Sequence, residues 1–336
     1  MSAADIAYHL RSGKFADRAL FVELLRRLER WRSFDDCAYV SMGGYTMADH
    51  AQVSRVLGLK TLVSFDEDDS TVRRAKFNRP TDAVEVRRAS AKEVAERMDD
   101  LFEVWGIRSD EGRIVWFDFT TPKRLQDDLS AFGRLVTTSA PGDVLRITLN
   151  ADPRNLPLAK PSGEELTNED RKRRRLENIL DDADFEADDP NVYADLPRIL
   201  ARAIGRISTK AAGRRRRTVC LSSVAYSDGT QMVSVTLAIT SQPSNASTVS
   251  HDPRGEAKLD DWSLASKQWD HVHDLRVQAL TSRERDHLER RLPSTPIADI
   301  LSEMGIEKLP GLTDPVAHFE RYRDLVRFYP DFVSLT

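Results

Sequence analysis

The chain has 336 residues, which is enough for one large domain or two with a hydrophobic core that needs no disulfide or metal. Its net charge of −4 excludes a general attraction to polyanions, so nucleic-acid binding would depend on local basic patches. No apolar stretch reaches 18 residues, which excludes a membrane-spanning helix, and the charged N-terminus does not resemble a signal peptide. Cys37 and Cys220 lie in apolar stretches, so we expect buried thiols and a cytoplasmic protein.

Residues 14–32 predict an amphipathic helix ahead of the first strand. Leu20, Leu24 and Leu28 recur every four positions, which places them on one face of a helix. We expect this face to pack against the sheet.

Residues 37–66 combine two strands, a glycine turn and a carboxylate in an order that predicts a nucleotide site. The first strand, 37–42, is followed by Gly43 and Gly44, and a second strand, 60–65, is followed by Asp66. A turn without Cβ atoms lets backbone N–H groups approach a ligand. Parallel strands end at the same edge of a sheet, so the Asp66 carboxylate can accept hydrogen bonds from a ribose diol. The alternative is an ordinary strand–helix turn followed by an exposed aspartate.

The helix between these strands is expected to begin at Thr46. Asp49 follows three residues later and has the spacing of a capping-box partner. Gly58 is placed to end this helix in a left-handed conformation.

Strands and helices continue to alternate up to residue 150. Ser70 or Asp69 is expected to cap the helix after Asp66, and Ser90 is expected to cap a single helix over residues 89–106. The remaining elements are a strand at 83–86, a strand at 113–117 that ends on Asp118, a helix at 125–135 and a strand at 144–149. This alternation predicts a doubly wound, mostly parallel α/β sheet.

The second half of the chain departs from this alternation. Residues 151–190 are rich in charge and predict an insertion with one exposed helix, after which a helix resumes at 196–210. Residues 217–227 and 230–240 flank Asp228-Gly229 and predict a β-hairpin. We expect one domain over residues 1–242 and a mostly helical C-terminal extension over residues 243–336, with helices at 275–291, 296–304 and 315–328.

Parallel strands that end in a hairpin resemble the class I S-adenosylmethionine-dependent methyltransferase fold, and the resemblance covers residues 14–241. Four stretches fall at the motifs of that family: VSMGG at 40–44, FDEDDSTVRRAKFN at 65–78, RAS at 88–90 and WFDFTTP at 116–122. The resemblance implies a seven-stranded sheet and S-adenosylmethionine as cofactor. The cofactor-binding residues that it implies are Ser41, Met42, Gly43, Gly44, Asp66, Glu67, Ala89, Ser90 and Asp118.

Two motifs depart from the usual pattern of the family. Ser41 and the adjacent glycines stand where an acidic residue and a Gly-x-Gly spacing are usual, and DFTTP lacks an adjacent pair of prolines. The chain also resembles a poorly described group of methyltransferase-like proteins through its Gly-Gly turn, its Asp-Phe-Thr motif and the strand end at 148–150. The departures favour, as an alternative, a catalytically degenerate fold that serves as a binding or regulatory subunit.

The residues after the strand at 113–117 are the candidates for catalysis. Asp118 could orient an amine or take a proton from a hydroxyl, Phe119 could stack on a planar substrate, and Thr120 could form a hydrogen bond. Asp118 could instead cap the following helix. Lys14 and Arg18 could lie over the cofactor carboxylate, although a solvated helix start is the favoured interpretation for them.

Two basic stretches suggest nucleic acid, with RNA favoured as the substrate. The candidate phosphate-binding residues are Arg173, Arg174, Arg175, Arg214 and Arg215. A solvated run of charges weighs about equally, and a small-molecule O- or N-methyltransferase is a further alternative. His271 and His273 lack a third spaced ligand, so we expect no metal site. The C-terminal helices could contact a protein partner, and the oligomeric state is left open.

Overall fold

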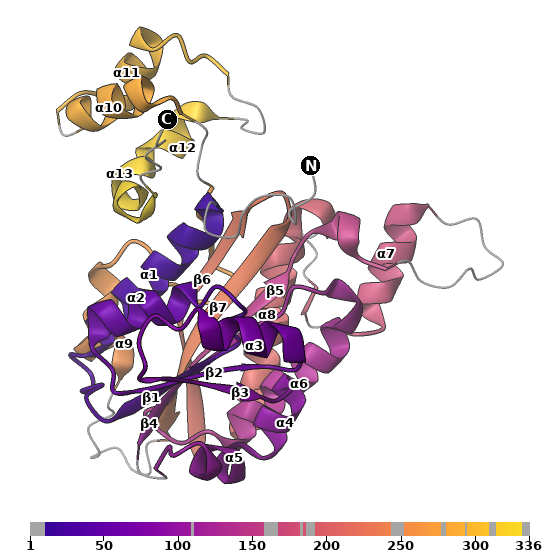
Figure 1. Cartoon of the computed structure of the whole chain (residues 1–336). Coiled ribbons are helices and arrows are strands. Elements are labelled where there is room, and N and C mark those ends of the chain that lie inside the picture. The colour runs from indigo at the N-terminus through magenta and orange to yellow at the C-terminus, as the bar shows by residue number, and fades with distance from the viewer. Residues whose placement is uncertain are drawn as a thin grey trace.

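The computed structural model describes residues 11–108, 111–157, 167–181, 184–185, 192–242, 252–276, 280–292, 294–308 and 314–330. Its centre is an eight-stranded sheet with the order β3-β2-β1-β4-β5-β7-β6-β8, shown in Figure 1. The strands are β1 (Cys37–Ser41), β2 (Thr61–Asp66), β3 (Val84–Arg88), β4 (Gly112–Asp118), β5 (Val144–Asn150), β6 (Arg216–Ser227), β7 (Gln231–Ser241) and β8 (Val272–Asp274).

The first five strands are parallel, and β7 lies antiparallel between β5 and β6. The hairpin between β6 and β7 turns at Gly229, whose φ of 85° is a left-handed conformation that glycine adopts without strain. The expected mostly parallel sheet with an antiparallel hairpin is therefore confirmed. The expected number of seven strands is too low, because β8 adds a short parallel strand beside β6.

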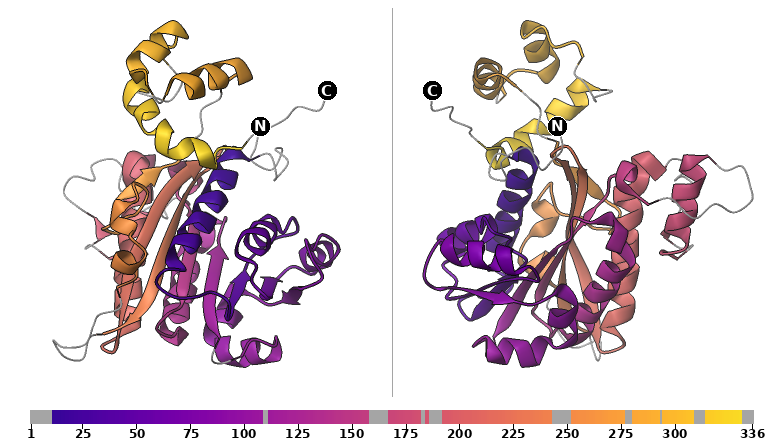
Figure 2. Two further views of the ribbon diagram at one scale, coloured as in Figure 1. Left: turned by 90° about the vertical axis from the view of Figure 1, so that its left-hand side faces the viewer. Right: turned by 45° about the vertical axis from the view of Figure 1, so that its right-hand side comes forward.

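Helices cover both faces of the sheet, so the body of the protein has three layers (Figures 1 and 2). One face carries α1 (Ser12–Leu28), α2 (Ala48–Leu57) and α3 (Asp69–Phe77). The other face carries α4 (Ala91–Glu96), α5 (Met98–Val104), α6 (Leu125–Thr138) and α8 (Val192–Ala212). Successive residues of β1 point to opposite faces, because Cys37 and Tyr39 join the first core cluster and Ala38 and Val40 join the second.

Several helix boundaries differ from those expected from the sequence. The helix expected over 89–106 is two helices, because the backbone at Arg97 leaves the helical region with φ −127° and ψ 33°. Ser90 caps the first of them and forms a capping box with Glu93, as expected. The cap of α3 is Asp68, which accepts a hydrogen bond from the Thr71 N–H, and is neither of the two residues proposed for it.

The charged segment after β5 contains α7 (Asn168–Glu177). Leu176 and Leu180 are buried in the second core cluster, so this segment packs against the domain. The sequence predicted an exposed helix here, and the helix is only partly exposed. Residues 158–166, 182–183 and 186–190 of the expected insertion lie outside the described residues.

The C-terminal region continues with α9 (Pro253–Glu256), α10 (Ser282–Arg291), α11 (Ile297–Glu303), α12 (Pro315–Glu320) and α13 (Tyr322–Leu325). The helices α10 to α13 gather beyond the sheet on the side where α1 begins, as Figure 2 shows. Leu288, Ile300 and Phe319 belong to the same core cluster as α1. Across the described part of the chain, no helix combines the length and apolar character that crossing a membrane requires.

Candidate functional site

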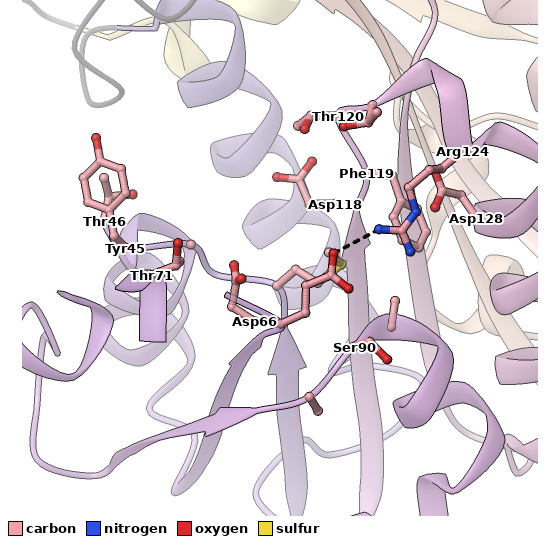
Figure 3. A pocket seen from close by; sticks show the side chains of 16 residues that line it. Tyr45, Thr46, Asp66, Thr71, Ser90, Asp118, Phe119, Thr120, Arg124 and Asp128 are labelled. Atoms are coloured by element: carbon pink, nitrogen blue, oxygen red, sulfur yellow. Dashed lines mark hydrogen bonds and ion pairs between the residues drawn. The ribbon is translucent and has the colours of Figure 1, made fainter. Parts of the chain in front are cut away.

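A cavity of about 370 Å³ opens at the ends of β1, β2 and β4. The chain leaves β1 toward β2 and β3, whereas β4 begins the other half of the sheet. This reversal of strand order leaves a crevice beyond the carboxyl ends of β1 and β4. Figure 3 shows Asp66 and Asp118 between two groups of lining residues, with Tyr45 and Thr46 on one side and Arg124 on the other.

Most of the residues that the sequence indicated as a cofactor or catalytic site line this one cavity. They are Met42, Gly44, Asp66, Glu67, Ala89, Ser90, Asp118, Phe119 and Thr120. Ser41 and Gly43 do not line it. The structure therefore brings four separate motifs to one place, although the role of each residue stays a prediction.

The two glycines of the turn meet different requirements. Gly44 has a φ of 56°, and a Cβ on it would have no heavy atom within 4 Å. A Cβ on Gly43 would lie only 2.7 Å from Cε1 of His50 and 2.8 Å from Oγ of Ser64. Gly44 thus allows a left-handed turn at the cavity, whereas Gly43 allows the turn to pack closely on the interior.

Asp49 is buried in α2, next to the glycine turn. It is not the capping-box partner that the sequence suggested. The residue before α2, Met47, has a left-handed conformation and makes no side-chain cap. The Asp49 carboxylate instead accepts hydrogen bonds from the hydroxyls of Tyr39 and Ser41 and contacts Nδ1 of His50 at 3.2 Å. It therefore places a buried negative charge directly behind Ser41, the position at which the sequence lacks a carboxylate.

The pKa values of Asp49 and His50 depend on each other. Burial alone would raise the pKa of Asp49, but the charge of His50 and the hydrogen bonds around the carboxylate lower it well below its usual range. Burial alone would lower the pKa of His50, whereas the Asp49 charge raises it. We infer that the two side chains form an ion pair under the glycine turn.

Two carboxyl groups in the main cavity have raised pKa values. Burial raises the pKa of Asp66, and the hydrogen bond that its Oδ1 accepts from the Asp68 N–H partly opposes this. Burial raises the pKa of Asp128 to about 7, against the opposing charge of Arg124. Figure 3 shows Asp128 beside Arg124, whose Nη1 pairs with Glu67 Oε1 at 2.9 Å. The cavity therefore contains a carboxyl group that titrates near neutral pH.

Asp118 pairs with Lys14 from the first turn of α1, with Nζ 2.7 Å from Oδ2. Both side chains are largely buried, with exposed fractions of 7% for Lys14 and 14% for Asp118. Arg18, one turn further along α1, is also buried. The favoured interpretation of a solvated helix start is therefore wrong. Asp118 is also not a helix cap, because the N-cap residues of the following 3₁₀ turn (Pro122–Arg124) and of α6 are Thr121 and Arg124.

A second cavity of about 200 Å³ lies next to the first and shares Asp118 and Thr120 with it. Its other walls come from α1, from the end of β5 and from the β6–β7 hairpin, through Lys14, Asn150, Tyr226 and Met232 among others. The sequence motifs did not indicate the hairpin residues of this cavity. They also did not indicate Arg124 and Asp128, whose only signal was their position shortly after the strand that ends on Asp118.

The basic residues proposed for nucleic acid do not converge on the cavities. Arg214 and Arg215 are exposed just before β6. Because β6 runs in the same direction as β5, its start lies at the edge of the sheet opposite the site. Arg173 pairs with Glu177 within α7 at 3.0 Å. Arg174 is exposed and Arg175 is half-buried in the same helix.

His271 and His273 are the two histidines that the sequence offered as a possible metal pair. The rings of His271 and His273 lie close together, with centroids 4.5 Å apart. No group of three or more His, Cys, Asp or Glu side chains is arranged to hold a metal within the described ranges.

A family model described as "Putative O-methyltransferase" matches residues 6–336. No curated protein is significantly similar to the chain.

Three solved structures are similar to the chain at low sequence identity. The O-methyltransferase from Bacillus cereus in complex with SAH has 17% identity and a TM-score of 0.38, over 70% of this chain and 86% of that one. Cofactor-bound Rv0187 from MTB has 11% identity and a TM-score of 0.38, over 71% and 86%. The N-methyltransferase NodS from Bradyrhizobium japonicum WM9 has 11% identity and a TM-score of 0.36, over 66% and 96%. Because the family model spans residues 6–336, the chain belongs to the putative O-methyltransferase family.

Proposed function

We propose that this chain is an S-adenosylmethionine-dependent methyltransferase that acts on a hydroxyl group of a small molecule. The observation that carries the proposal is the cavity that joins Gly44, Asp66 and Asp118 at the carboxyl ends of parallel strands. These are the residues at which the sequence resembles class I methyltransferases. The description of the family favours oxygen as the methyl acceptor.

The residues of the main cavity fit the chemistry of this cofactor. Asp66 offers a carboxylate for a ribose diol, and Gly44 offers a turn with no side chain. Ala89 and Phe119 offer small and aromatic surfaces that suit an adenine ring. Asp66 would hold the ribose, and the strand end at Ala89 would lie beside the base.

When bound, the cofactor would supply an electrophilic methyl group, which would move to the acceptor oxygen while the electron pair of its bond to sulfur stays on sulfur. The protein must align the acceptor and remove the hydroxyl proton. Oδ2 of Asp118 is held by Lys14, and Oδ1 is buried without a hydrogen-bond partner among the described residues. Oδ1 is therefore the atom proposed to accept the proton.

The placement of the basic residues supports a small acceptor over RNA. Arg214 and Arg215 lie just before β6, at the end of the sheet opposite Asp118. An RNA strand bound to them would therefore not reach Asp118 directly. Arg173 is paired within its own helix. RNA is the second candidate, supported by the exposed Arg174 and by the two basic stretches.

Calorimetry with S-adenosylhomocysteine tests the cofactor assignment. We expect Asp66→Asn to weaken binding roughly 10- to 100-fold, because hydrogen bonds to a charged group contribute about 1.5–3 kcal/mol. Asp69→Asn is the matched control, since it removes a carboxylate three residues further along, at the start of α3, that does not line the cavity. Equal binding by both variants and the wild type would contradict the assignment.

Transfer of labelled methyl to small phenols and alcohols, compared with transfer to total RNA, tests the acceptor class. Label in the small molecules that is lost in Asp118→Asn supports the proposal. Label in RNA alone would support the second candidate. Binding of S-adenosylhomocysteine without transfer to either class would favour the degenerate binding or regulatory subunit.

A further inference from the structure

The second cavity has walls from parts of the chain that are far apart in sequence. The first turn of α1 forms one wall, and the β6–β7 hairpin forms another. Asp228 in the hairpin accepts hydrogen bonds from the N–H groups of Gly13 and Lys14, both at 2.7 Å. A Cβ on Gly13 would lie 3.0 Å from Asp228 Oδ1, so glycine permits this close contact. These bonds hold the two walls in a fixed relation to each other.

Asp118 stands between the two cavities and lines both. Lys14 holds one carboxylate oxygen, while Oδ1 has no hydrogen-bond partner among the described residues. A buried acceptor without a donor costs free energy, and a ligand that donates a hydrogen bond removes that cost. The unsatisfied oxygen therefore favours a ligand with a hydroxyl group at this boundary.

The lining of the second cavity indicates the size and polarity of that ligand. Its volume of about 200 Å³ is below the roughly 300–1,000 Å³ of pockets for drug-sized molecules. Tyr226 and Met232 give it apolar walls. The cations Arg11 and Lys14 are balanced by the anions Asp118 and Asp228, so the lining gives no net attraction to a phosphate chain.

We propose that this second cavity is the methyl-acceptor site, and that it takes a compact hydroxyl compound with a mostly apolar body. The inference rests on the proposed function and adds the place and chemical class of the acceptor. The hydroxyl donates its hydrogen bond to Oδ1 of Asp118, and the apolar body lies between Tyr226 and Met232. Lys14 is a positioning residue, because it fixes the orientation of the Asp118 carboxylate.

Single engineered cysteines can report on each cavity separately. Thr230→Cys places a thiol in the wall of the second cavity. Ala91→Cys places one in the wall of the first cavity and not in that of the second, although Ala91 also lines an adjoining cavity of about 240 Å³. The native Cys37 and Cys220 are buried, and burial raises the pKa of their thiols to about 11 and about 12. A thiol reagent should therefore label the introduced cysteines first, and the wild type measures the background.

The expected result is selective protection. Phenol at millimolar concentration should slow the labelling of Thr230→Cys severalfold and leave that of Ala91→Cys unchanged. Toluene, which lacks the hydroxyl, should protect Thr230→Cys much less. S-adenosylhomocysteine should protect Ala91→Cys.

The outcomes separate this inference from the function on which it rests. No protection of Thr230→Cys by phenol, with Ala91→Cys still protected by S-adenosylhomocysteine, would overturn the acceptor site alone. Equal protection by phenol and toluene would overturn the role of the hydroxyl. Absence of protection at Ala91→Cys by S-adenosylhomocysteine would instead count against the proposed function.

Discussion

Lys14 in α1 and Asp118 at the end of β4 form an ion pair in which Nζ lies 2.7 Å from Oδ2. The Lys14 ammonium also lies 4.8 Å from the ring centroid of Trp116, on the same strand as Asp118. The pair joins the N-terminal helix to the strand that supplies the proposed catalytic carboxylate. The position of that carboxylate therefore depends on a helix that comes before the first strand of the nucleotide-binding unit.

The first prediction concerns the stability that this pair contributes. Lys14→Met keeps the length of the side chain but leaves the Asp118 charge without its partner. We expect a loss of about 3 kcal/mol in the free energy of unfolding by urea, because removing one member of a buried pair is costly. Lys14→Met combined with Asp118→Asn should recover part of that loss.

Lys92→Met is the control, because Lys92 is exposed in α4 and its replacement should change stability by less than about 0.5 kcal/mol. A loss in Lys14→Met no larger than that of Lys92→Met would contradict the ion pair. So would a double variant that loses the sum of the two single effects.

The second prediction concerns Asp128, whose pKa burial raises to about 7 from a usual value near 3.8. The folded protein holds this proton more tightly than the unfolded chain, so folding is favoured at low pH. That contribution is fully present below about pH 4 and is lost as the pH rises to about 7. Asp128→Asn keeps a neutral side chain at every pH, so it should be more stable than the wild type at pH 8 by roughly 1–3 kcal/mol.

Thermal unfolding at pH 5 and pH 8 measures this difference. Asp127→Asn is the control, because Asp127 is exposed at the neighbouring position of α6. A stability difference between Asp128→Asn and the wild type that does not grow from pH 5 to pH 8 would show that Asp128 is not held protonated.

The sequence predicted the alternation of strands and helices, because each short apolar stretch is followed by a segment in which apolar residues recur with the spacing of a helix. It also predicted the convergence of Gly44, Asp66 and Asp118, since parallel strands end at one edge of the sheet. The strand β8 was missed because it has only three residues and no period of its own.

The sequence could not indicate contacts that form only on folding. Lys14 looks like an exposed helix start, because its partner Asp118 comes from a distant strand. Asp49 has the spacing of a capping-box partner, but its carboxylate accepts hydrogen bonds in the interior from the hydroxyls of Tyr39 and Ser41 in β1. In both cases a charged side chain is buried because tertiary structure supplies a partner, which local spacing does not show.

The third prediction separates the two glycines of the turn. Gly44→Ala introduces a Cβ into open space at a φ of 56°, so it should cost about 1 kcal/mol from backbone strain. Gly43→Ala places a Cβ 2.7 Å from His50 and should cost more. Urea unfolding measures both values, and a larger loss for Gly44→Ala than for Gly43→Ala would contradict the packing described here.

The last prediction concerns the charge on His50. The ring is fully buried, which disfavours its protonated form, whereas the Asp49 charge raises its pKa. In the wild type the pKa of His50 should therefore lie above its usual value near 6.5. In Asp49→Asn the opposing charge is gone, so burial should lower the pKa of His50 below that value.

NMR titration of the His50 Cε1–H resonance measures both pKa values. Ser41→Ala is the matched control, because it removes one hydrogen bond from Asp49 but keeps the carboxylate charge, so the pKa of His50 should stay raised. The raised pKa of His50 means that its charge stabilises the fold fully below about pH 6.5 and that this contribution falls as the pH rises through the folded pKa. Because the pKa of Asp49 is lowered, the contribution of the carboxylate is present above about pH 4 and is lost as the pH falls further, so the pair stabilises the fold fully only between these two values. If the pKa of His50 is the same in Asp49→Asn and in Ser41→Ala, the carboxylate charge is not what holds the proton under the glycine turn.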